Sequence, residues 1–385
     1  MADYIITSLQ SWDIGIGSTI KNTAQEISKH HRVFYISTPP SLMQWIRDNK
    51  ECTQKKDKKI NDNLYIVYCK IPSLPVSSMP FKWLFNITNY INNRCIAHTI
   101  SKAIYRYSIQ DYIHLIDTDI FRSRYLKQLL HPILSIYYRR DYVIGVDYWK
   151  KYGTACEQAL VRQSDIVVTN SSFFTEELTP LNPHIITTNT GVDLELYNSS
   201  IIHDIPTDMQ HIPSPIIGYT GAVIERRLDS KLLYEVAKRL PEYSFVFVGP
   251  QDEHFQNHAL HQLKNVYFIG TKEVKNLPCY IQHFDVCINP QLVNPITEGN
   301  YPLKIDEYLA MGKPVVATGT HTMYDVFNSY AHLANNPDSW IEALKTALSE
   351  THDKQLSTER IAFAHTHSWA NSVERIYKAI ENFNR

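Results

Sequence analysis

The sequence predicts an α/β protein of two domains, each with a parallel sheet covered by helices. Its 385 residues are enough for two hydrophobic cores. Two stretches show the alternation of short apolar strands and amphipathic helices that is typical of such sheets. Between them, residues 199–214 hold Pro206 and Pro213 and lack periodicity. We therefore expect a first domain at 1–198, a linker at 199–214, a second domain at 215–367 and a final helix at 368–385.

The first domain opens with a strand, a glycine-containing loop, a helix and a second strand. These elements are expected at Tyr4–Ile6, Ile20–His30 and Val33–Ile36. Gly15 and Gly17 in the loop let the backbone approach a phosphate or a sugar closely. The loop is not a dinucleotide fingerprint, because the third glycine position holds Ile20 and the second strand ends in Ser37 rather than in an acidic residue. NAD is therefore discounted.

The rest of the first domain continues this pattern. A strand that ends at Asp117 and a strand followed by Arg139, Arg140 and Asp141 place two charged clusters at strand ends. Ser171 is a natural cap for a helix after the next strand. Further elements are expected at Tyr112–Ile116, Ile133–Tyr138, Gly153–Arg162, Asp165–Thr169 and Ile185–Thr187.

The second domain repeats the α/β alternation. Its strands and first helix are expected at Ile216–Tyr219, Ser230–Leu240, Phe245–Gly249, Val266–Gly270 and Asp285–Asn289. Val373, Ile376, Tyr377 and Ile380 stand at helical spacing near the end of the chain. The last helix is therefore amphipathic and packs on a neighbouring element.

The stretch Asn294–Thr318 is predicted to form a loop, a short helix and a buried strand in quick succession. Pro302 suits the first helical position, with Asn300 or Tyr301 as the cap, and Gly312 suits the position just past the helix end. The β-branched strand is expected at Pro314–Thr318. A loop-to-helix turn beyond a strand end is where α/β sheets hold anions and sugars.

Glu307 and Lys304 lie inside this predicted helix. A carboxylate has two acceptor oxygens spaced to take both hydroxyls of a ribose diol, and a helix sets its direction. Gly312-Lys313-Pro314 is not a P-loop, because Ser or Thr must follow the lysine. The stretch is therefore predicted to bind a nucleotide through Glu307.

Composition bounds the partners. A formal net charge of −1 gives no global reason to expect nucleic acid. The N-terminus lacks a signal-peptide pattern, no apolar run reaches the length of a membrane span, and the cysteines form no disulfide framework, so we expect a cytoplasmic protein. The segment Met79–Tyr90 combines Phe81, Trp83 and Phe85 with Lys82. It could rest on an anionic membrane or pack in the core.

No metal or cofactor is expected. His254, His258 and His261 share a helical face, but they belong to no H-E-x-x-H motif and have no cysteine ligands nearby. Surface histidines are the better interpretation.

Several segments together resemble the GT-B glycosyltransferases, in particular the retaining family 4 of bacterial surface-polysaccharide type. Gly218-Tyr219-Thr220-Gly221-Ala222 with Arg226, Arg227 and Asp229 is similar to the start of the family's nucleotide-sugar domain. The run from Pro302 to Thr318 is similar to its "ExLAxGKPVVAT" signature. The other matching segments are Val246–Gly249, Asn265–Gly270, Asp165–Ser171, Thr190–Asp193 and Trp12–Asp13.

The resemblance implies two facing Rossmann-like domains with a cleft between them and a C-terminal helix that crosses back to the first domain. It implies donor binding mainly by the second domain, with Glu307 on the ribose and Arg226 or Arg227 on the diphosphate. Lys304 is a further candidate for the diphosphate, and backbone N–H groups of Asn300 or Tyr301 could contact the donor. The glycine loop of Gly15 and Gly17 matches the family's loop near the donor phosphates.

The chain departs from the family in two places. The family's paired glutamates are eight apart, whereas Glu298 and Glu307 are 307 − 298 = 9 apart, and the acidic residue eight after Glu298 is Asp306. Tyr138 stands where many members carry a histidine.

Because a tyrosine replaces the histidine, the charged residues at the strand ends of the first domain become the candidates for its role. Arg139 and Arg140 become candidates for contacts with the sugar or the acceptor. Asp141 and Asp117 are candidates for the catalytic base, although strand-end carboxylates also commonly cap turns.

The resemblance implies a metal-independent hexosyltransferase-like enzyme that moves a sugar from a nucleoside diphosphate sugar to a glycan or lipid-linked acceptor in surface polysaccharide synthesis. The expected location is the cytoplasm, with peripheral contact at the inner membrane surface as an open alternative. Two other functions stay open: a GT-B-fold nucleotide-sugar epimerase, and a catalytically silent homologue that binds sugar nucleotides. An epimerase would turn over donor without acceptor, and a silent homologue would bind nucleotide and transfer nothing.

Overall fold

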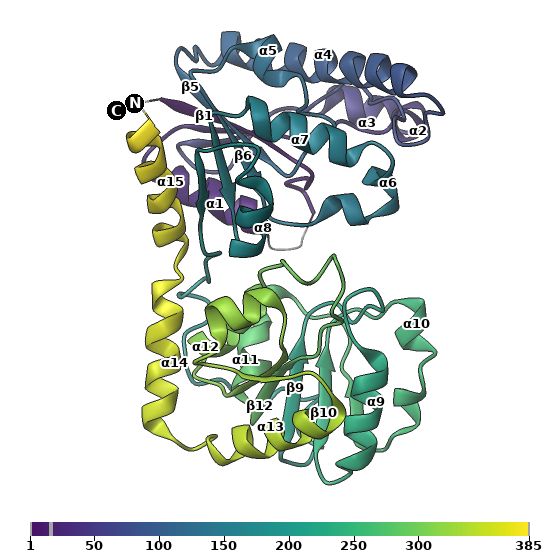
Figure 1. Cartoon of the computed structure of the whole chain (residues 1–385), viewed down its shortest axis with the longest axis vertical. Coiled ribbons are helices and arrows are strands. Elements are labelled where there is room, and N and C mark those ends of the chain that lie inside the picture. Colours follow the sequence, from purple (N-terminus) through teal and green to yellow (C-terminus); the bar gives the residue numbers. More distant parts are fainter. Residues whose placement is uncertain (1, 15–17, 384–385) are drawn as a thin grey trace. The chain divides into compact units, whose positions relative to one another are not determined.

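The computed structural model describes residues 2–14 and 18–383, which divide into two compact units (Figure 1). The first unit holds residues 1–188 and 372–385, and the second holds 189–371. The boundary therefore precedes the predicted end of the first domain at residue 198. Tyr197, Met209 and Ile212 explain the difference, because their side chains belong to a core cluster of the second unit. The stretch 199–214 is packed on that unit.

The first unit is built on an eight-stranded sheet with the order β3-β4-β2-β1-β5-β6-β7-β8. All neighbouring strands are parallel except β3 and β4. The strands are β1 (Asp3–Ser8), β2 (Val33–Ile36), β3 (Lys58–Lys59), β4 (Leu64–Val67), β5 (Tyr112–Asp117), β6 (Leu134–Arg139), β7 (Ile166–Thr169) and β8 (Ile185–Thr187). The helices are α1 (Thr19–Ile27), α2 (Leu42–Arg47), α3 (Asn49–Gln54), α4 (Lys82–Arg106), α5 (Leu126–Leu130), α6 (Asp147–Lys150), α7 (Gly153–Gln163), α8 (Ser172–Leu178) and most of α15 (Trp369–Phe383), with a 3-10 turn at Val143–Gly145.

Alternating side chains of this sheet enter different core clusters, as the pleat of a strand requires. Tyr4 and Ile6 of β1 pack in a cluster with α1 and α15, whereas Ile5 between them packs in a cluster with α4 and α5. Val373 and Ile376 bring α15 into the first of these clusters. The amphipathic face predicted for the last helix is confirmed, and it covers the first unit.

The second unit contains a six-stranded, fully parallel sheet with the order β11-β10-β9-β12-β13-β14. Its strands are β9 (Ile216–Thr220), β10 (Ser244–Val248), β11 (Val266–Phe268), β12 (Val286–Asn289), β13 (Val315–Thr318) and β14 (His332–Ala334). Its helices are α9 (Ser230–Arg239), α10 (Glu253–Gln256), α11 (Leu277–Gln282), α12 (Leu303–Ala310), α13 (Pro337–Ser349) and α14 (Lys354–Thr366), with 3-10 turns at Ala259–Gln262 and Val274–Asn276 and a π-helical turn at Met323–Phe327.

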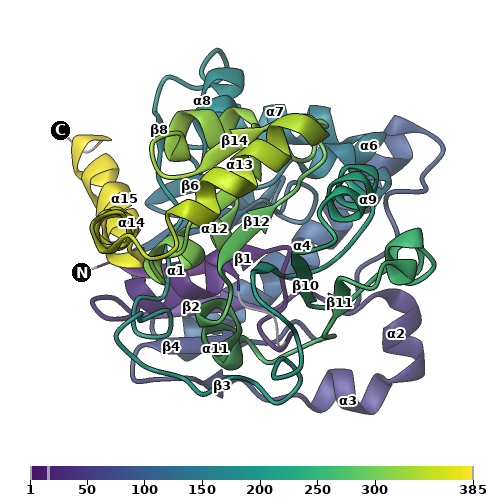
Figure 2. The same cartoon turned by 90° about the horizontal axis from the view of Figure 1, so that it is seen from below.

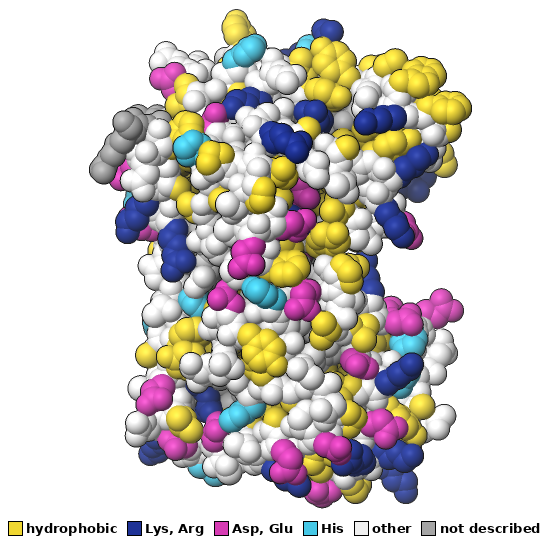
Figure 3. Space-filling model, in the orientation of Figure 1, with side chains coloured by type: hydrophobic (Ala, Val, Ile, Leu, Met, Phe, Trp, Pro, Cys, Tyr) yellow, Lys and Arg dark blue, Asp and Glu magenta, His cyan; other side chains and the backbone are white. Residues whose placement is uncertain are grey.

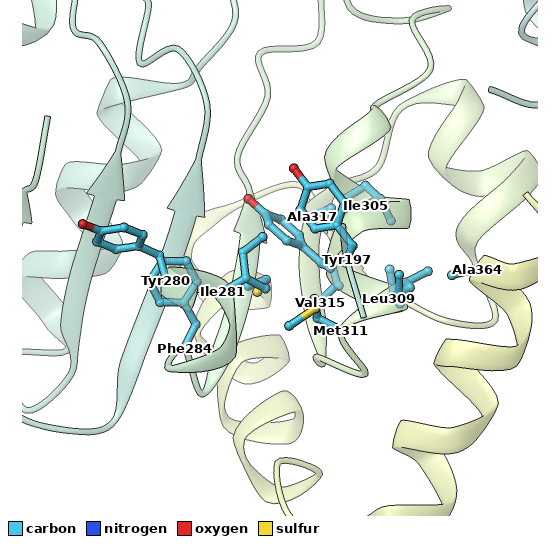
Figure 4. Close-up of a cluster of buried hydrophobic side chains, with 14 of the residues drawn as sticks. Tyr197, Tyr280, Ile281, Phe284, Ile305, Leu309, Met311, Val315, Ala317 and Ala364 are labelled. Carbon is cyan, nitrogen blue, oxygen red and sulfur yellow. The ribbon is translucent and has the colours of Figure 1, made fainter. Parts of the chain in front are cut away.

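Helices cover both faces of this second sheet (Figure 2). One core cluster joins the sheet to α9 and α13, and the other joins it to α11, α12 and α14. Figure 4 shows part of the second cluster, in which Leu309 of α12 lies near Val315 of β13 and Ala364 of α14. The prediction of an α/β protein with parallel sheets is confirmed.

The predicted loop, helix and strand at 294–318 are present, with one correction. Pro302 is the residue that precedes α12, not its first helical residue, and no side chain caps the helix. Gly312 has the expected place past the helix end, with φ at +71°, and its N–H donates to the carbonyl of Leu309. A Cβ at Gly312 would also lie 2.2 Å from the Ser357 hydroxyl of α14. Glycine is therefore required there twice, by the backbone and by packing.

Gly218, inside β9, supplies a test of the core. A Cβ added at this position would lie 2.1 Å from the ring of Phe284. We expect Gly218→Ala to lower the free energy of unfolding by about 1–3 kcal/mol, because overpacking forces the ring to move. Urea denaturation measures the change. The double variant Gly218→Ala/Phe284→Leu should recover part of the loss, and full stability of the single variant would contradict the packing described.

Candidate functional site

Buried polar side chains without partners gather at the carboxyl ends of β12 and β13. Asn289 ends β12 fully buried, and neither its amide nitrogen nor its oxygen makes a hydrogen bond within the described part of the chain. Asn289 is paired in register with Ala317, so Thr318 at the end of β13 is its neighbour, and the Thr318 hydroxyl is also unpartnered. The other such side chains in this region are Gln291, Asn300, Thr320 and Thr322.

An unpartnered buried polar group costs about 1–3 kcal/mol. Proteins rarely keep several together unless water, an ion or a ligand satisfies them. The carboxyl edge of this sheet is therefore the candidate ligand site of the second unit.

A hydrogen bond ties α12 to this edge. The backbone N–H of Thr220, the last residue of β9, donates to the hydroxyl oxygen of Tyr308 over 2.8 Å. The Thr220 hydroxyl lies 3.2 Å from the same oxygen. Because Tyr308 is fully buried in α12, this bond sets how the helix meets the sheet.

Lys304 in the first turn of α12 lies beside the loop that follows β9. Its ammonium nitrogen is 5.0 Å from the ring centroid of Tyr219. Gly221 has φ at +126°, and a Cβ there would lie 3.4 Å from Cε of Lys304. A cation, an open glycine backbone and a helix N-terminus thus meet at one place, which suits a phosphate group.

Glu307 lies one helical turn after Lys304 and is half-buried. Burial raises the pKa of Glu307 to about 7, and the neighbouring Asp306 and Asp193 act in the same direction. Lys304 and the Tyr197 hydroxyl oppose this rise, because both favour the ionised carboxylate. Glu307 is therefore a carboxyl group that can change its charge near neutral pH.

The other residues predicted to bind the donor, two arginines and the turn before α12, differ in how far they are buried. Arg226 is exposed and Arg227 half-buried, and both lie in the loop between β9 and α9. Asn300 is buried, and its side-chain oxygen has no hydrogen-bond partner in the described residues. Tyr301 instead packs in the core and donates from its hydroxyl to Oδ2 of Asp306 over 2.7 Å. Its side chain is therefore turned into the protein, not toward a ligand.

Glu298 and Asp306, the two acidic residues that stand eight apart, lie in different surroundings. Asp306 is fully buried between Tyr301 and His367, with the His367 Nδ1 atom 2.7 Å from its Oδ1. Glu298 accepts a hydrogen bond from the backbone N–H of His321 over 3.0 Å. It therefore lies against the loop after β13 that carries the unpartnered threonines, so Glu298 is the acidic residue of the two at the candidate site.

In the first unit, Asp117 and Arg140 form a pair at the carboxyl ends of β5 and β6. Asp117 is fully buried and accepts hydrogen bonds from Ser8 Oγ over 2.6 Å and from Arg140 Nη2 over 2.8 Å. Arg140 also contacts Asp117 through Nε. Ser8 and the Arg140 guanidinium already occupy both carboxylate oxygens, so this geometry argues against Asp117 as a base. It orients Arg140 instead.

Asp141 is the more accessible carboxylate of this cluster. Its side chain is 42% exposed, and Oδ2 lies 3.9 Å from Nη1 of Arg140. Its exposure leaves this carboxylate within reach of a bound molecule.

Arg139, the residue before Arg140, has the opposite setting. It is fully buried, with Nη2 3.0 Å from Glu177 Oε2 and Nε 3.4 Å from Glu157 Oε1, and it lies over the Phe174 ring at 4.4 Å. This burial contradicts a direct contact between Arg139 and a sugar or an acceptor. Successive residues of a strand point to opposite faces, and only Arg140 points to the side of Asp117.

Two predicted site residues, Gly15 and Gly17, lie outside the described residues. Conversely, the sequence-based prediction missed the polar side chains at the ends of β12 and β13, which include Asn289 and Thr318. The signal was present, because both directly end strands that the apolar runs predict, at the edge where α/β sheets bind ligands.

Within residues 2–14 and 18–383, no three His, Cys, Asp or Glu side chains are grouped as metal ligands. Over the same residues, no helix has the length and apolar character that crossing a bilayer requires.

The buried setting of Arg139 gives a testable expectation. Arg139→Met should lower the free energy of unfolding by about 3–5 kcal/mol, because it leaves the buried Glu157 without its cation. Urea unfolding measures this loss. The control Arg162→Met removes an exposed arginine from α7 and should change stability by less than about 0.5 kcal/mol. If both variants have equal stability, Arg139 does not serve as this counter-charge.

Sequence comparison links the second unit to a known group. Residues 214–350 match the family model described as Glycosyl transferases group 1. The putative teichuronic acid biosynthesis glycosyltransferase TuaH of Bacillus subtilis is 27% identical over 275 residues, which cover 64% of this chain and 68% of TuaH.

Solved structures share the fold along the whole chain. Sucrose-phosphate synthase from Thermosynechococcus elongatus superposes with a TM-score of 0.73 at 14% identity, over 99% of each chain. HepE from Anabaena in complex with UDP gives a TM-score of 0.67 at 11% identity, over 99% of this chain and 100% of HepE. A glycosyltransferase from Rickettsia africae gives 0.64 at 16% identity, over 100% and 99%. The second unit therefore matches a glycosyltransferase family model, and the whole chain has the GT-B fold of these solved structures.

Proposed function

We propose that the chain is a retaining, metal-independent glycosyltransferase of family 4 that works in the cytoplasm. It moves a sugar from a nucleoside diphosphate sugar to a glycan or lipid-linked acceptor of a surface polysaccharide. The observation that carries the proposal is the set of unpartnered buried polar groups at the carboxyl edge of the second sheet, the edge to which Tyr308 ties α12 with its Glu307 and Lys304. A nucleotide sugar supplies hydroxyl and phosphate groups that would satisfy them.

Donor binding is assigned to groups of different chemistry on this edge. The Glu307 carboxylate accepts hydrogen bonds from the two ribose hydroxyls. Lys304 and the backbone at Gly221 face the diphosphate, with Arg226 or Arg227 supplying further positive charge. The sugar takes the region of Asn289, Thr318 and Thr320, where unpartnered amide and hydroxyl groups are available.

The chemistry follows from the leaving group. When the bond between the sugar and the diphosphate breaks, negative charge develops on the departing phosphate. Cations already held beside that phosphate lower the barrier, because they need no rearrangement as the charge forms. In this proposal Lys304 and one arginine take the role that a divalent metal ion has in other enzymes.

Addition of a chelator should therefore leave the rate of transfer unchanged.

The acceptor hydroxyl must lose a proton during transfer. Asp141 is the preferred protein base, because its side chain is 42% exposed and can reach a bound acceptor. A phosphate oxygen of the donor is the alternative acceptor of this proton. Asp117 is assigned instead to holding Arg140, whose guanidinium remains available to a polar group of the acceptor.

Two relatives support the choice of substrates. TuaH is described as a putative teichuronic acid biosynthesis glycosyltransferase, which favours a polysaccharide product. HepE structures contain UDP, UDP with glucose, or UDP-glucose. UDP sugars are therefore the first donors to screen.

Replacement of Glu307 tests the donor site. A UDP sugar should raise the melting temperature of the wild-type protein, because a ligand that binds only the folded state stabilises it. Glu307→Ala should weaken donor affinity by at least about tenfold, since it removes hydrogen bonds to a charged acceptor. Isothermal titration or thermal-shift titration measures both values.

The matched control is Glu235→Ala, which removes an exposed glutamate from α9 of the same unit. Its donor affinity should equal that of the wild type. Absence of any shift with UDP, GDP, ADP and CMP sugars would contradict the donor site. Donor binding without transfer to any acceptor would instead indicate a silent homologue, and donor turnover without acceptor an epimerase.

The raised pKa of Glu307 predicts a pH dependence. Below about pH 7 the carboxyl keeps a proton, and one of its oxygens donates instead of accepting; above it both oxygens accept. Donor affinity should therefore rise as the pH is raised through about 7. An intact nucleotide sugar is the right probe, because its two phosphates are already fully ionised. Affinity in Glu307→Gln should not follow this change, and an identical pH profile in that variant would assign it to another group.

A further inference from the structure

The first half of α4 buries several polar residues and exposes several apolar ones, unlike an ordinary surface helix. Asn89, Asn92 and Asn93 face inward and are buried. The Asn92 side chain exchanges two hydrogen bonds with the backbone of Leu74, at 2.8 and 2.9 Å, and Asn93 donates to the carbonyl of Phe121 over 2.9 Å. Polar residues thus occupy part of the buried side of the helix. The solvent-facing side, which is polar in an ordinary surface helix, here carries apolar residues.

The opposite side of α4 exposes apolar side chains on successive turns. Trp83, Ile87 and Ile91 are spaced four apart and are 61%, 53% and 45% exposed. Phe81, immediately before the helix, is stacked on Trp83 with ring centroids 6.4 Å apart. We call Phe81, Trp83, Ile87 and Ile91 the outer face of α4. This face runs along the helix for more than two turns, about 12 Å. No polar residue stands in the row Trp83, Ile87, Ile91.

The sequence alternatives for this segment are both realised, on different sides of the helix. Phe85 points inward and packs against the rings of Phe121 and Tyr152, at 5.1 and 4.2 Å. Phe81 and Trp83 point outward into solvent.

The stretch of chain that carries the outer face has positive charges and no acidic residue. No Asp or Glu stands between Asp62 and Asp111, although the whole chain has a formal net charge of −1. Lys82, Arg94 and Lys102 lie exposed on α4 itself. Lys151 from the neighbouring α6–α7 turn donates to the carbonyls of Met79 and Pro80, just before the helix, over 2.8 and 3.1 Å. Figure 3 shows yellow and dark blue side chains gathered over this end of the first unit.

We propose that the outer face of α4 docks on an anionic lipid bilayer. The aromatic rings enter the interface between head groups and acyl chains, where tryptophan is favoured, and the lysines and arginines contact the lipid phosphates. The helix lies on the membrane surface. Among the described residues, no helix is long and apolar enough to span a bilayer.

Charge decides between a bilayer and a second copy of this chain. Two outer faces brought together would place Lys82, Arg94 and Lys102 of one copy against the same cations of the other, which is unfavourable. An anionic bilayer offers both the apolar phase and the opposite charge.

Vesicle co-sedimentation of the full-length protein tests the proposal. The wild type should bind vesicles of phosphatidylcholine with phosphatidylglycerol more tightly than vesicles of phosphatidylcholine alone, and high salt should weaken this binding. Trp83→Ser/Ile87→Ser should lower the partition coefficient at least about tenfold, because it removes two apolar side chains from the interface. Arg94→Gln/Lys102→Gln should lower it by about fivefold for each charge removed.

The control Ile202→Ser/Ile205→Ser removes two exposed apolar residues from the second unit and should bind like the wild type. Glu307→Ala should also bind vesicles normally, so failure of the donor site and failure of the docking face are distinguishable. Circular dichroism and urea unfolding establish that each variant is folded. Unchanged vesicle binding in both α4 variants would overturn the proposal. So would a wild-type dimer that Trp83→Ser/Ile87→Ser converts to a monomer in light scattering.

Discussion

The hydrogen bond from the Thr220 backbone to the Tyr308 hydroxyl is the constraint on which the second unit's site depends. It joins the end of β9 to the middle of α12 inside the core, where a lost partner would leave a buried N–H unsatisfied. Once α12 is held there, Lys304 lies over the loop at Gly221, and Glu307 faces Tyr197. One bond thus positions both a cation and a carboxyl group relative to the open edge of the sheet.

Burial assigns different roles to neighbouring charged residues in both units. Arg139 and Arg140 are adjacent, yet one guanidinium is enclosed by Glu157 and Phe174 while the other is held by Asp117 at a strand end. Asp306 and Glu307 repeat this contrast, because Asp306 is enclosed by His367 and Glu307 is half-buried. In each pair one residue is fully buried among its partners, and its neighbour is more exposed.

Local patterns predicted most elements and pointed to part of the candidate site. The apolar β-branched run ending at Thr318 and the glycine at position 312 are found as expected, because strand burial and a left-handed helix end are local requirements. Glu307 was found from its place in a helix after such a loop. Tyr301 and Arg139 could not be placed in this way, since their partners stand 66 residues away at His367 and 38 residues away at Glu177 (177 − 139).

The sequence by itself determined that this chain has two α/β units with parallel sheets, and it singled out the region around Glu307 as the candidate nucleotide-binding region. Periodicity, caps and strand-end composition act over a few residues and can be read along the chain. Only the tertiary structure decided that Asn289 and Thr318 share one edge, that Asp117 is occupied by Arg140, and that α4 turns its asparagines inward and its tryptophan outward. These outcomes depend on which groups distant segments bring to a buried polar atom, because such an atom is stable only when a partner reaches it.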